Sequence, residues 1–135
     1  MKANQKTRIL VVDDELPVCR SICSALEQAE YAVDRALSGE EALQRLQSRA
    51  YEVMIVDLMM PGLSGMDVLS AAREMDPKTS IIIMTAYPSA QTAVRSVREG
   101  AVDYLPKPFT PRELQAAVDR ALKERRSKSD PDAMD

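Results

Sequence analysis

The sequence predicts an α/β domain in which a parallel sheet of five strands is covered by helices on both faces. Two observations carry this prediction. Short apolar runs rich in β-branched residues alternate five times with segments that have apolar residues at helical spacing. Because most of these runs are apolar along their whole length, they fit strands buried on both faces, with right-handed crossover helices above and below. The expected fold is therefore a doubly wound, five-stranded parallel sheet with five helices.

The element boundaries come from the apolar runs and from the turn and capping residues between them. Strands are expected over residues 8–12, 31–37, 53–56, 80–85 and 102–105. Helices are expected to begin near residues 17, 38, 65, 89 and 110. Four of these helices have an expected end, near residues 28, 75, 99 and 125.

Residues with specific helix-start preferences support the first three helices. Pro17 can open the first, because the N–H group that proline lacks has no partner in a first turn. Ser38 and Glu41 have the spacing of a capping box, in which each side chain accepts from the other's backbone N–H. The loop over 58–65 contains Pro61 and two glycines, and the third helix is expected to follow it.

The last two strands and helices have equally distinct signals. The run Ile81–Ile83 is the most β-prone in the chain. Gly100 is placed to end the fourth helix, since glycine readily adopts the left-handed conformation found after a helix. Thr110, Pro111 and Glu113 supply an N-cap, a first-turn proline and a third-position acid for the fifth helix.

Length and charge limit the possible functions. The 135 residues fit one domain, expected over 8–126, with a flexible N-terminus over 1–7 and a disordered tail or linker stub over 127–135. Eighteen basic against 21 acidic residues give a net charge of -3, so binding to nucleic acid or to a membrane is not expected. No apolar run is long enough to span a membrane, and a cytoplasmic protein is expected.

Two residue types restrict the chemistry further. The sequence has no histidine, which excludes histidine catalysis and histidine metal ligation by this chain. Cys19 and Cys23 lie four residues apart within the apolar pattern of the first helix, which favours buried thiols over a redox pair.

Three aspartates follow two of the expected strands. Asp13 and Asp14 come directly after the first strand and Asp57 directly after the third. If these strands are neighbours, the three carboxylates meet at the edge of the sheet where α/β proteins place their sites. Two unit charges about 4 Å apart repel by roughly 4 kcal/mol at an effective dielectric constant near 20, so such a cluster favours a divalent cation. Aspartates at strand ends can also simply cap helices or form turns.

Two further polar residues follow the fourth and fifth strands at the same edge. Thr85 ends the fourth strand and Lys107 follows the fifth. An acidic cluster with a bound cation, a hydroxyl group and a lysine together indicate a phosphoryl-transfer site. The combination is more specific than any of its members.

These residues lie within motifs that resemble one family. The motifs are ILVVDDE over 9–15, VDLMMPGLSG over 56–65, MTA over 84–86 and YLPKPF over 104–109. In order and spacing they resemble the receiver domain of two-component response regulators, over about residues 8–125. The stretch over 85–109 is most similar to receivers of the nitrogen-regulation class, whose members usually precede an ATPase that remodels sigma-54 polymerase. The resemblance also implies the flavodoxin-like strand order 2-1-3-4-5.

The resemblance implies a role for each residue of the acidic cluster. Asp57 would be the phosphoacceptor, whose carboxylate attacks a phosphoryl group to give an aspartyl phosphate. Asp14, Asp57 and the backbone carbonyl of Met59 would bind Mg²⁺ directly, and Asp13 would bind it through a water molecule.

The resemblance also implies roles for residues around the cluster. Lys107 and the Thr85 hydroxyl would each bind a phosphoryl oxygen. The Lys107-Pro108 bond would be cis, an ordinary trans turn being the alternative. Phosphorylation would draw Thr85 toward Asp57 and let the Tyr104 ring rotate inward, unless Tyr104 is only a half-buried aromatic residue on an edge strand.

The resemblance finally implies partners, and it implies which residues set the lifetime of the phosphorylated state. The phosphoryl donor would be a histidine kinase or a phosphotransfer protein. Phosphorylation would shift the surface formed by the fourth helix, fifth strand and fifth helix, and this shift would control an output, expected to be transcription. The same surface could form a homodimer. Met59 and Tyr87 occupy the positions through which receivers tune hydrolysis of the aspartyl phosphate. The expected protein is not an enzyme in the usual sense, since it would only catalyse its own phosphorylation and dephosphorylation.

One enzyme class remains as an alternative. A Mg²⁺-dependent phosphatase of the haloacid-dehalogenase type also forms an aspartyl phosphate on an aspartate that follows a strand. That class needs a second acid two residues after the nucleophile, where this chain has Met59. A dinucleotide-binding domain is less favoured, because no Gly-x-Gly-x-x-Gly motif follows the first strand. The sequence leaves open whether the domain is a whole protein or part of a longer regulator.

Overall fold

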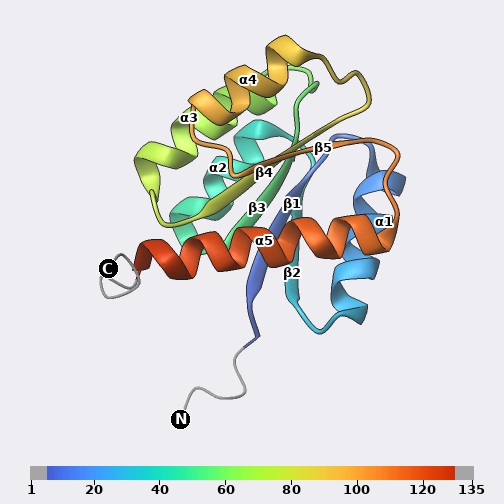
Figure 1. The fold of residues 1–135 in the computed structure, drawn as a ribbon. Helices are drawn as coiled ribbons and strands as arrows, with labels where there is room; N and C mark the ends of the chain where they lie inside the picture. Colours follow the sequence, from blue (N-terminus) through green and yellow to red (C-terminus); the bar gives the residue numbers. More distant parts are fainter. Residues whose placement is uncertain (1–5, 130–135) are drawn as a thin grey trace.

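The fold is a five-stranded parallel sheet with helices on both faces (Figure 1), in a computed structural model that describes residues 6–129. The strand order is β2-β1-β3-β4-β5, as expected. The strands are β1 (Arg8–Val12), β2 (Ala32–Ala36), β3 (Val53–Asp57), β4 (Ser80–Thr85) and β5 (Asp103–Pro106). The helices are α1 (Leu16–Gln28), α2 (Gly39–Ser48), α3 (Gly65–Met75), α4 (Ala90–Arg98) and α5 (Pro111–Ser129).

The sheet separates two hydrophobic cores. Helices α1 and α5 cover one face, and α2, α3 and α4 lie on the other (Figure 1). Successive residues of a strand point to opposite faces, so Ile9 and Val11 of β1 pack against α1 and α5, whereas Leu10 and Val12 pack toward α2 and α3. The central strands are therefore apolar throughout, as predicted. The edge strand β2 departs from this pattern, since Arg35 is exposed and the half-buried Asp34 accepts a hydrogen bond from the Tyr51 hydroxyl.

The start of α2 differs from the predicted capping box. Ser38 accepts a hydrogen bond from the backbone N–H of Glu41, but the Glu41 carboxylate accepts from Leu37 and not from Ser38. Reciprocal boxes do form at α5, between Thr110 and Glu113, and at α3. At α3 the Ser64 hydroxyl accepts from the N–H of Asp67 and the Asp67 carboxylate accepts from that of Ser64. Aspartate at this position closes the box as glutamate would, although the residue-type rule selects Glu or Gln.

The last part of the chain departs slightly from the predicted boundaries. Strand β5 ends one residue later than expected, and α5 runs to Ser129, four residues past its expected end. The helix thus includes residues 127–129 of the predicted tail. Residues 130–135 of that tail, and residues 1–5 of the predicted flexible N-terminus, lie outside the described residues. Gly100 has a φ of 108° and follows α4, as predicted.

Helix α4 has an unusual distribution of residues. Its one buried residue is Ser96, whose hydroxyl donates to the carbonyl of Thr92. Val94 and Val97 are 55% and 63% exposed, and Ala90 is exposed on the same side. The polar residue therefore faces the protein and the apolar residues face solvent, which reverses the usual arrangement of a surface helix.

Two remaining expectations concern cysteines and membranes. Cys19 and Cys23 are both buried and both free thiols, as the helical pattern predicts. Within residues 6–129, no helix has the length and apolar character needed to cross a lipid bilayer.

Candidate functional site

Three carboxylates meet at the carboxyl ends of β1 and β3. Asp13 and Asp14 follow β1, Asp57 is the last residue of β3, and these strands are hydrogen-bonded neighbours. One carboxylate oxygen from each residue lies within 4.8 Å of the other two. Asp13 and Asp57 are buried, whereas Asp14 is exposed. The adjacent parallel strands thus bring together the three acids, as expected from the sequence.

The backbone around the acids fixes their positions. The N–H of Asp13 donates to the carbonyl of Ala36 at 3.1 Å, and its carboxylate accepts from the N–H of Glu15 at 2.9 Å. Beyond Asp57, the loop returns so closely that a Cβ added at Gly65 would lie 2.5 Å from the Asp57 carbonyl oxygen. Glycine at position 65 therefore allows α3 to start directly against the end of β3.

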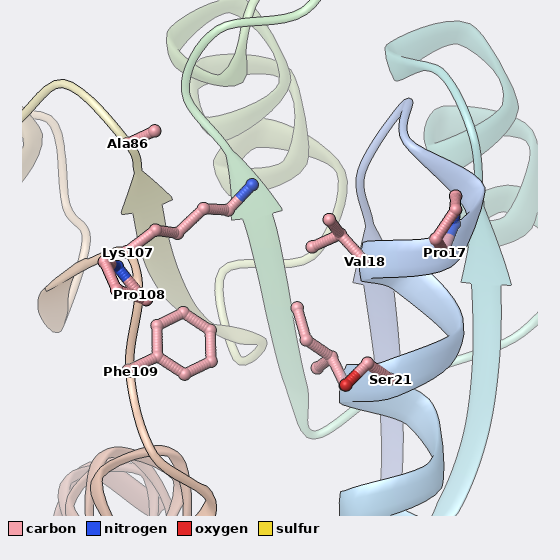
Figure 2. Close-up of a pocket in the computed structure, with 8 residues that line it drawn as sticks. Pro17, Val18, Ser21, Ala86, Lys107, Pro108 and Phe109 are labelled. Carbon is pink, nitrogen blue, oxygen red and sulfur yellow. The ribbon is translucent and has the colours of Figure 1, made fainter.

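Lys107 reaches the acidic cluster from the far edge of the sheet. Its Nζ lies 2.6 Å from Asp13 Oδ2 and 3.5 Å from Asp57 Oδ1, and its side chain is only 14% exposed. Figure 2 shows this side chain extending from the loop after β5 toward the end of β3. The Lys107-Pro108 peptide bond is cis, as expected. In this structure the lysine pairs mainly with Asp13, the carboxylate beside the expected phosphoacceptor.

Thr85 and Tyr104 lie on neighbouring strands but have separate partners. Thr85 is fully buried, and its Oγ1 accepts from the N–H of Tyr87 at 3.0 Å. Tyr104 is half-buried, and its hydroxyl accepts from the N–H of Ser89 at 3.2 Å and lies 2.6 Å from Thr92 Oγ1. The Tyr104 hydroxyl is thus bonded to the first turn of α4, where it supplements the Ser89 cap.

The two residues expected to tune hydrolysis are both exposed. Met59 is 59% and Tyr87 is 75% exposed. Met59 follows Asp57 by two residues and Tyr87 follows Thr85 by two, so each lies beyond the end of a strand that contributes to the site. Neither side chain forms a hydrogen bond or ion pair with another described residue.

Burial and neighbouring charges shift the pKa values of Asp57 and Lys107. Burial raises the pKa of Asp57 to about 6 from 3.8, Lys107 opposes the rise, and Asp13 and Asp14 add to it. Burial alone would lower the pKa of Lys107. The hydrogen bond from Lys107 to Asp13 and the negative charge of Asp57 outweigh the effect of burial, so the pKa of Lys107 is raised. One ammonium group therefore does not compensate three carboxylates.

The donor set fits Mg²⁺. The three clustered groups are carboxylates, and hard oxygen ligands are those that Mg²⁺ prefers. Burial, together with the charges of Asp13 and Asp14, raises the pKa of Asp57, and a divalent ion bound by the three carboxylates would stabilise its charged form. Asp14, Asp57 and the Met59 carbonyl would hold the ion directly, and Asp13 would contribute through a water molecule.

A groove beside Lys107 was not anticipated from the sequence. It has a volume of about 600 Å³ and lies between α1 and the loop after β5, with Val18, Ile22 and Phe109 among its apolar lining (Figure 2). Pro17, Ser21, Ala86 and Pro108 complete this surface. The sequence signal for it is Phe109, an aromatic residue directly after Lys107-Pro108 in the loop before the fifth helix.

The sequence matches one family of known proteins. A family model described as the response regulator receiver domain matches residues 9–119. The chain belongs to this family. It is 39% identical over 123 residues to the transcriptional regulatory protein ResD of Bacillus subtilis, an alignment that covers 91% of this chain and 51% of ResD.

Solved structures agree with this assignment. The CheY-like receiver domain protein of Methanospirillum hungatei superposes with a TM-score of 0.88 at 29% identity, covering 92% of this receiver domain and 99% of that chain. NtrX of Brucella abortus gives a TM-score of 0.87 at 27% identity, covering 93% of this chain and 28% of NtrX. The latter match is consistent with the expected likeness to the nitrogen-regulation class. The receiver domain therefore spans about half of ResD and a smaller share of NtrX.

Membership of the receiver family does not favour the phosphatase alternative. In addition, the side chain two residues after Asp57 is the exposed thioether of Met59, which cannot serve as a general acid. The protein is a two-component signalling domain whose relatives are transcriptional regulators.

The raised pKa of Asp57 predicts that Mg²⁺ affinity depends on pH. A proton competes with the metal for this carboxylate, so affinity should fall as the pH drops through about 6. Between about pH 7 and about pH 5 the apparent affinity should weaken roughly tenfold, whereas a carboxylate with an ordinary pKa would cause little change in this range.

Isothermal titration calorimetry of Mg²⁺ binding at several pH values would measure this dependence. Glu74→Gln, which removes an exposed acid from α3, is the matched control and should follow the wild-type curve. An affinity that stays constant down to about pH 5 would contradict a raised Asp57 pKa.

Proposed function

We propose that Asp57 accepts a phosphoryl group from a phosphohistidine, on a histidine kinase or a phosphotransfer protein, and that the change reaches the surface formed by α4, β5 and α5. The observation that carries the proposal is the juxtaposition of a buried carboxylate with two further acids and Lys107. We place this function in the cytoplasm, with an output in transcription. The family membership and the regulatory relatives support it.

The chemistry follows from the residues around Asp57. A carboxylate oxygen of Asp57 attacks phosphorus, the P–N bond to the donor imidazole breaks, and a P–O bond forms. Mg²⁺ bound by the acids would neutralise charge on the transferred group. Lys107 exchanges its bond to Asp13 for one to a phosphoryl oxygen, which needs only a short movement of a flexible side chain. The domain thus acts as a phosphoacceptor that promotes its own modification, without turnover of a separate substrate.

The groove beside Lys107 is suited to contact with the donor protein. Its apolar lining, including Val18 and Phe109, is directly beside the lysine that faces Asp57. A helix that presents phosphohistidine could place apolar neighbours in this groove while its imidazole lies over Asp57.

The response would use Thr85 and Tyr104. A phosphoryl oxygen offers the Thr85 hydroxyl an acceptor near Asp57, and movement of Thr85 would shift the loop that contains Tyr87, whose N–H donates to it. Inward rotation of Tyr104 would then break its hydrogen bonds to Ser89 and Thr92. Because α4 buries only Ser96, loss of these bonds would leave it free to move.

The first experiment tests Asp57 as the phosphoacceptor. With Mg²⁺ and acetyl phosphate, the wild-type domain should gain one phosphoryl group, seen by intact mass spectrometry, and Asp57→Asn should gain none. Lys107→Ala should still bind Mg²⁺. On addition of beryllofluoride, however, the spectra of this variant should no longer show the movement of α4 that the wild type shows.

Asp76→Asn is the matched control, because Asp76 caps α3 at the opposite edge of the sheet. It should be labelled like the wild type. A phosphoryl adduct of undiminished yield on Asp57→Asn would contradict the assignment.

The exposed apolar side of α4 supports a homodimer. Ala90, Val94 and Val97 of α4 follow one another at spacings of four and three residues, the pattern of a helix-packing seam, and the exposed Tyr87 lies in the loop just before the helix. Two copies could pack these stripes about a two-fold axis, with β5 and α5 beside them. We infer that phosphorylation promotes or reorganises this contact.

Sedimentation equilibrium with and without beryllofluoride tests the dimer. The wild type should shift toward a dimer on addition, and Val94→Glu should not, because a charge would be buried in the contact. Met75→Glu is the matched control, since Met75 is an exposed apolar residue at the end of α3. Equal association of the wild type and Val94→Glu would exclude this surface.

Met59 and Tyr87 should make the phosphorylated state long-lived. Hydrolysis needs a water molecule aligned behind phosphorus; methionine orients water weakly, and an exposed tyrosine ring can shield the site. Replacing Met59 with Asn and Tyr87 with Glu should therefore speed phosphate loss, on the order of tenfold.

The rate is measured as loss of the phosphoryl adduct after removal of acetyl phosphate, at saturating Mg²⁺. Tyr31→Phe, which alters an unrelated tyrosine beside α5, serves as the control. An equal or slower loss in the double variant would show that these positions do not control the water.

A further inference from the structure

A second cavity lies at the edge of the sheet opposite Asp57. It has a volume of about 280 Å³ and is found where β4 begins at Ser80 and where Val102 leads into β5. The end of α3 and the C-terminal half of α5 approach each other there (Figure 1). Nothing in the phosphoryl-transfer chemistry uses this cavity.

The cavity is lined by basic side chains. Arg73, Lys78 and Arg125 contribute to its wall, and among residues 6–129 no acidic residue does. Among the described residues, neither Arg73 nor Lys78 forms an ion pair. Asp76, the acid nearest Lys78 along the chain, accepts from the backbone N–H of Lys78 and does not line the cavity. This concentration of positive charge contrasts with the net charge of -3 for the whole chain.

The two arginines are held in place by backbone carbonyls. Arg73 Nη1 donates to the carbonyl of Pro77 at 3.1 Å, and Arg125 Nε donates to that of Lys78 at 3.0 Å. Arg73 also lies against Gly100, where an added Cβ would be 2.6 Å from its Nε. The Arg73 guanidinium is therefore oriented in advance, and one of its five N–H groups is used by the carbonyl.

The buried floor of the cavity is already satisfied. The Thr79 hydroxyl donates to the carbonyl of Tyr51, and the Ser80 hydroxyl donates to that of Ala121. Recognition of a ligand would therefore depend on the basic wall. The hydrogen bonds of Arg73 and Arg125 to carbonyls in the turn after α3 give these two arginines a structural role. Lys78 has no such role, because its ammonium group has no partner among the described residues.

We propose that this cavity binds the phosphate groups of a small molecule. The Arg73 fork matches two oxygens of one phosphate, and Lys78 adds a mobile point charge at the rim. The volume lies near the lower limit of small-molecule sites and suits a diphosphate or triphosphate group more than a large ring system. The site is separate from Asp57 and does not depend on its phosphorylation.

Titration of the ¹⁵N-labelled chain with pyrophosphate tests the site by NMR. Mg²⁺ is left out and chloride keeps the ionic strength constant. The amides of Lys78, Ser80 and Val102 should show saturable shifts. The amides of Asp14 and Ala86 report binding at the other edge of the sheet, which would be a separate event.

Variants distinguish a built site from general attraction of anions. Arg73→Gln and Lys78→Gln should each weaken binding about tenfold or more, since each removes a charged donor. Arg112→Gln, at the exposed start of α5, should bind like the wild type. Amide spectra of each variant establish that it is folded.

Three results would overturn the proposal. One is the absence of saturable shifts at the cavity up to about 10 mM pyrophosphate. Another is equal weakening by Arg112→Gln, which would mean that only general charge is involved. The third is tighter binding of a short polyglutamate peptide than of pyrophosphate at the same amides, which would assign the cavity to an acidic protein segment.

Discussion

The site depends on an imbalance of charge at the end of β3. Three carboxylates share one ammonium group, and the most important of them, Asp57, is almost fully buried. A pKa raised from 3.8 to about 6 corresponds to a penalty of a few kcal/mol on the charged form, as an order of magnitude. The folded chain tolerates this penalty because two strongly apolar cores stabilise the rest of the sheet. A cation or a phosphoryl group with its counterions would therefore relieve an existing instability.

The contact between Lys107 and Asp13 connects this imbalance to the rest of the sheet. Lys107 follows the edge strand β5, and its bond to Asp13 crosses β4 and β3 to reach β1. Its own N–H donates to the carbonyl of Thr85, so its backbone position is tied to β4. Any group that displaces Asp13 from the lysine therefore acts on the strand that also contains Tyr104. Tyr104 in turn bonds to the start of α4.

Much of this arrangement could be predicted from the sequence because it depends on short-range patterns. Apolar runs such as Ile81–Ile83 define central strands, and polar residues directly after them must share one edge. The capping box at Ser64 was missed because Asp67 replaces the usual glutamate. The partners of Lys107 and the grooves beside α1 and α5 could not be predicted, since they depend on side chains brought together from distant parts of the chain. The spacing of Val94 and Val97 places them on one side of α4, but only the fold shows that this apolar side faces solvent.

The division of the interior into two cores has a consequence for how such a domain can diverge. A residue substituted in the core beneath α1 and α5 does not contact a residue substituted in the core beneath α2 and α3, because the sheet separates the two cores. The effects of two such substitutions on stability should then be close to additive. A lineage could remodel the side of the molecule next to the groove, and with it the choice of upstream protein, while the side that includes α4 keeps its downstream contacts. Specificity for input and for output could thus evolve at different rates within one small domain.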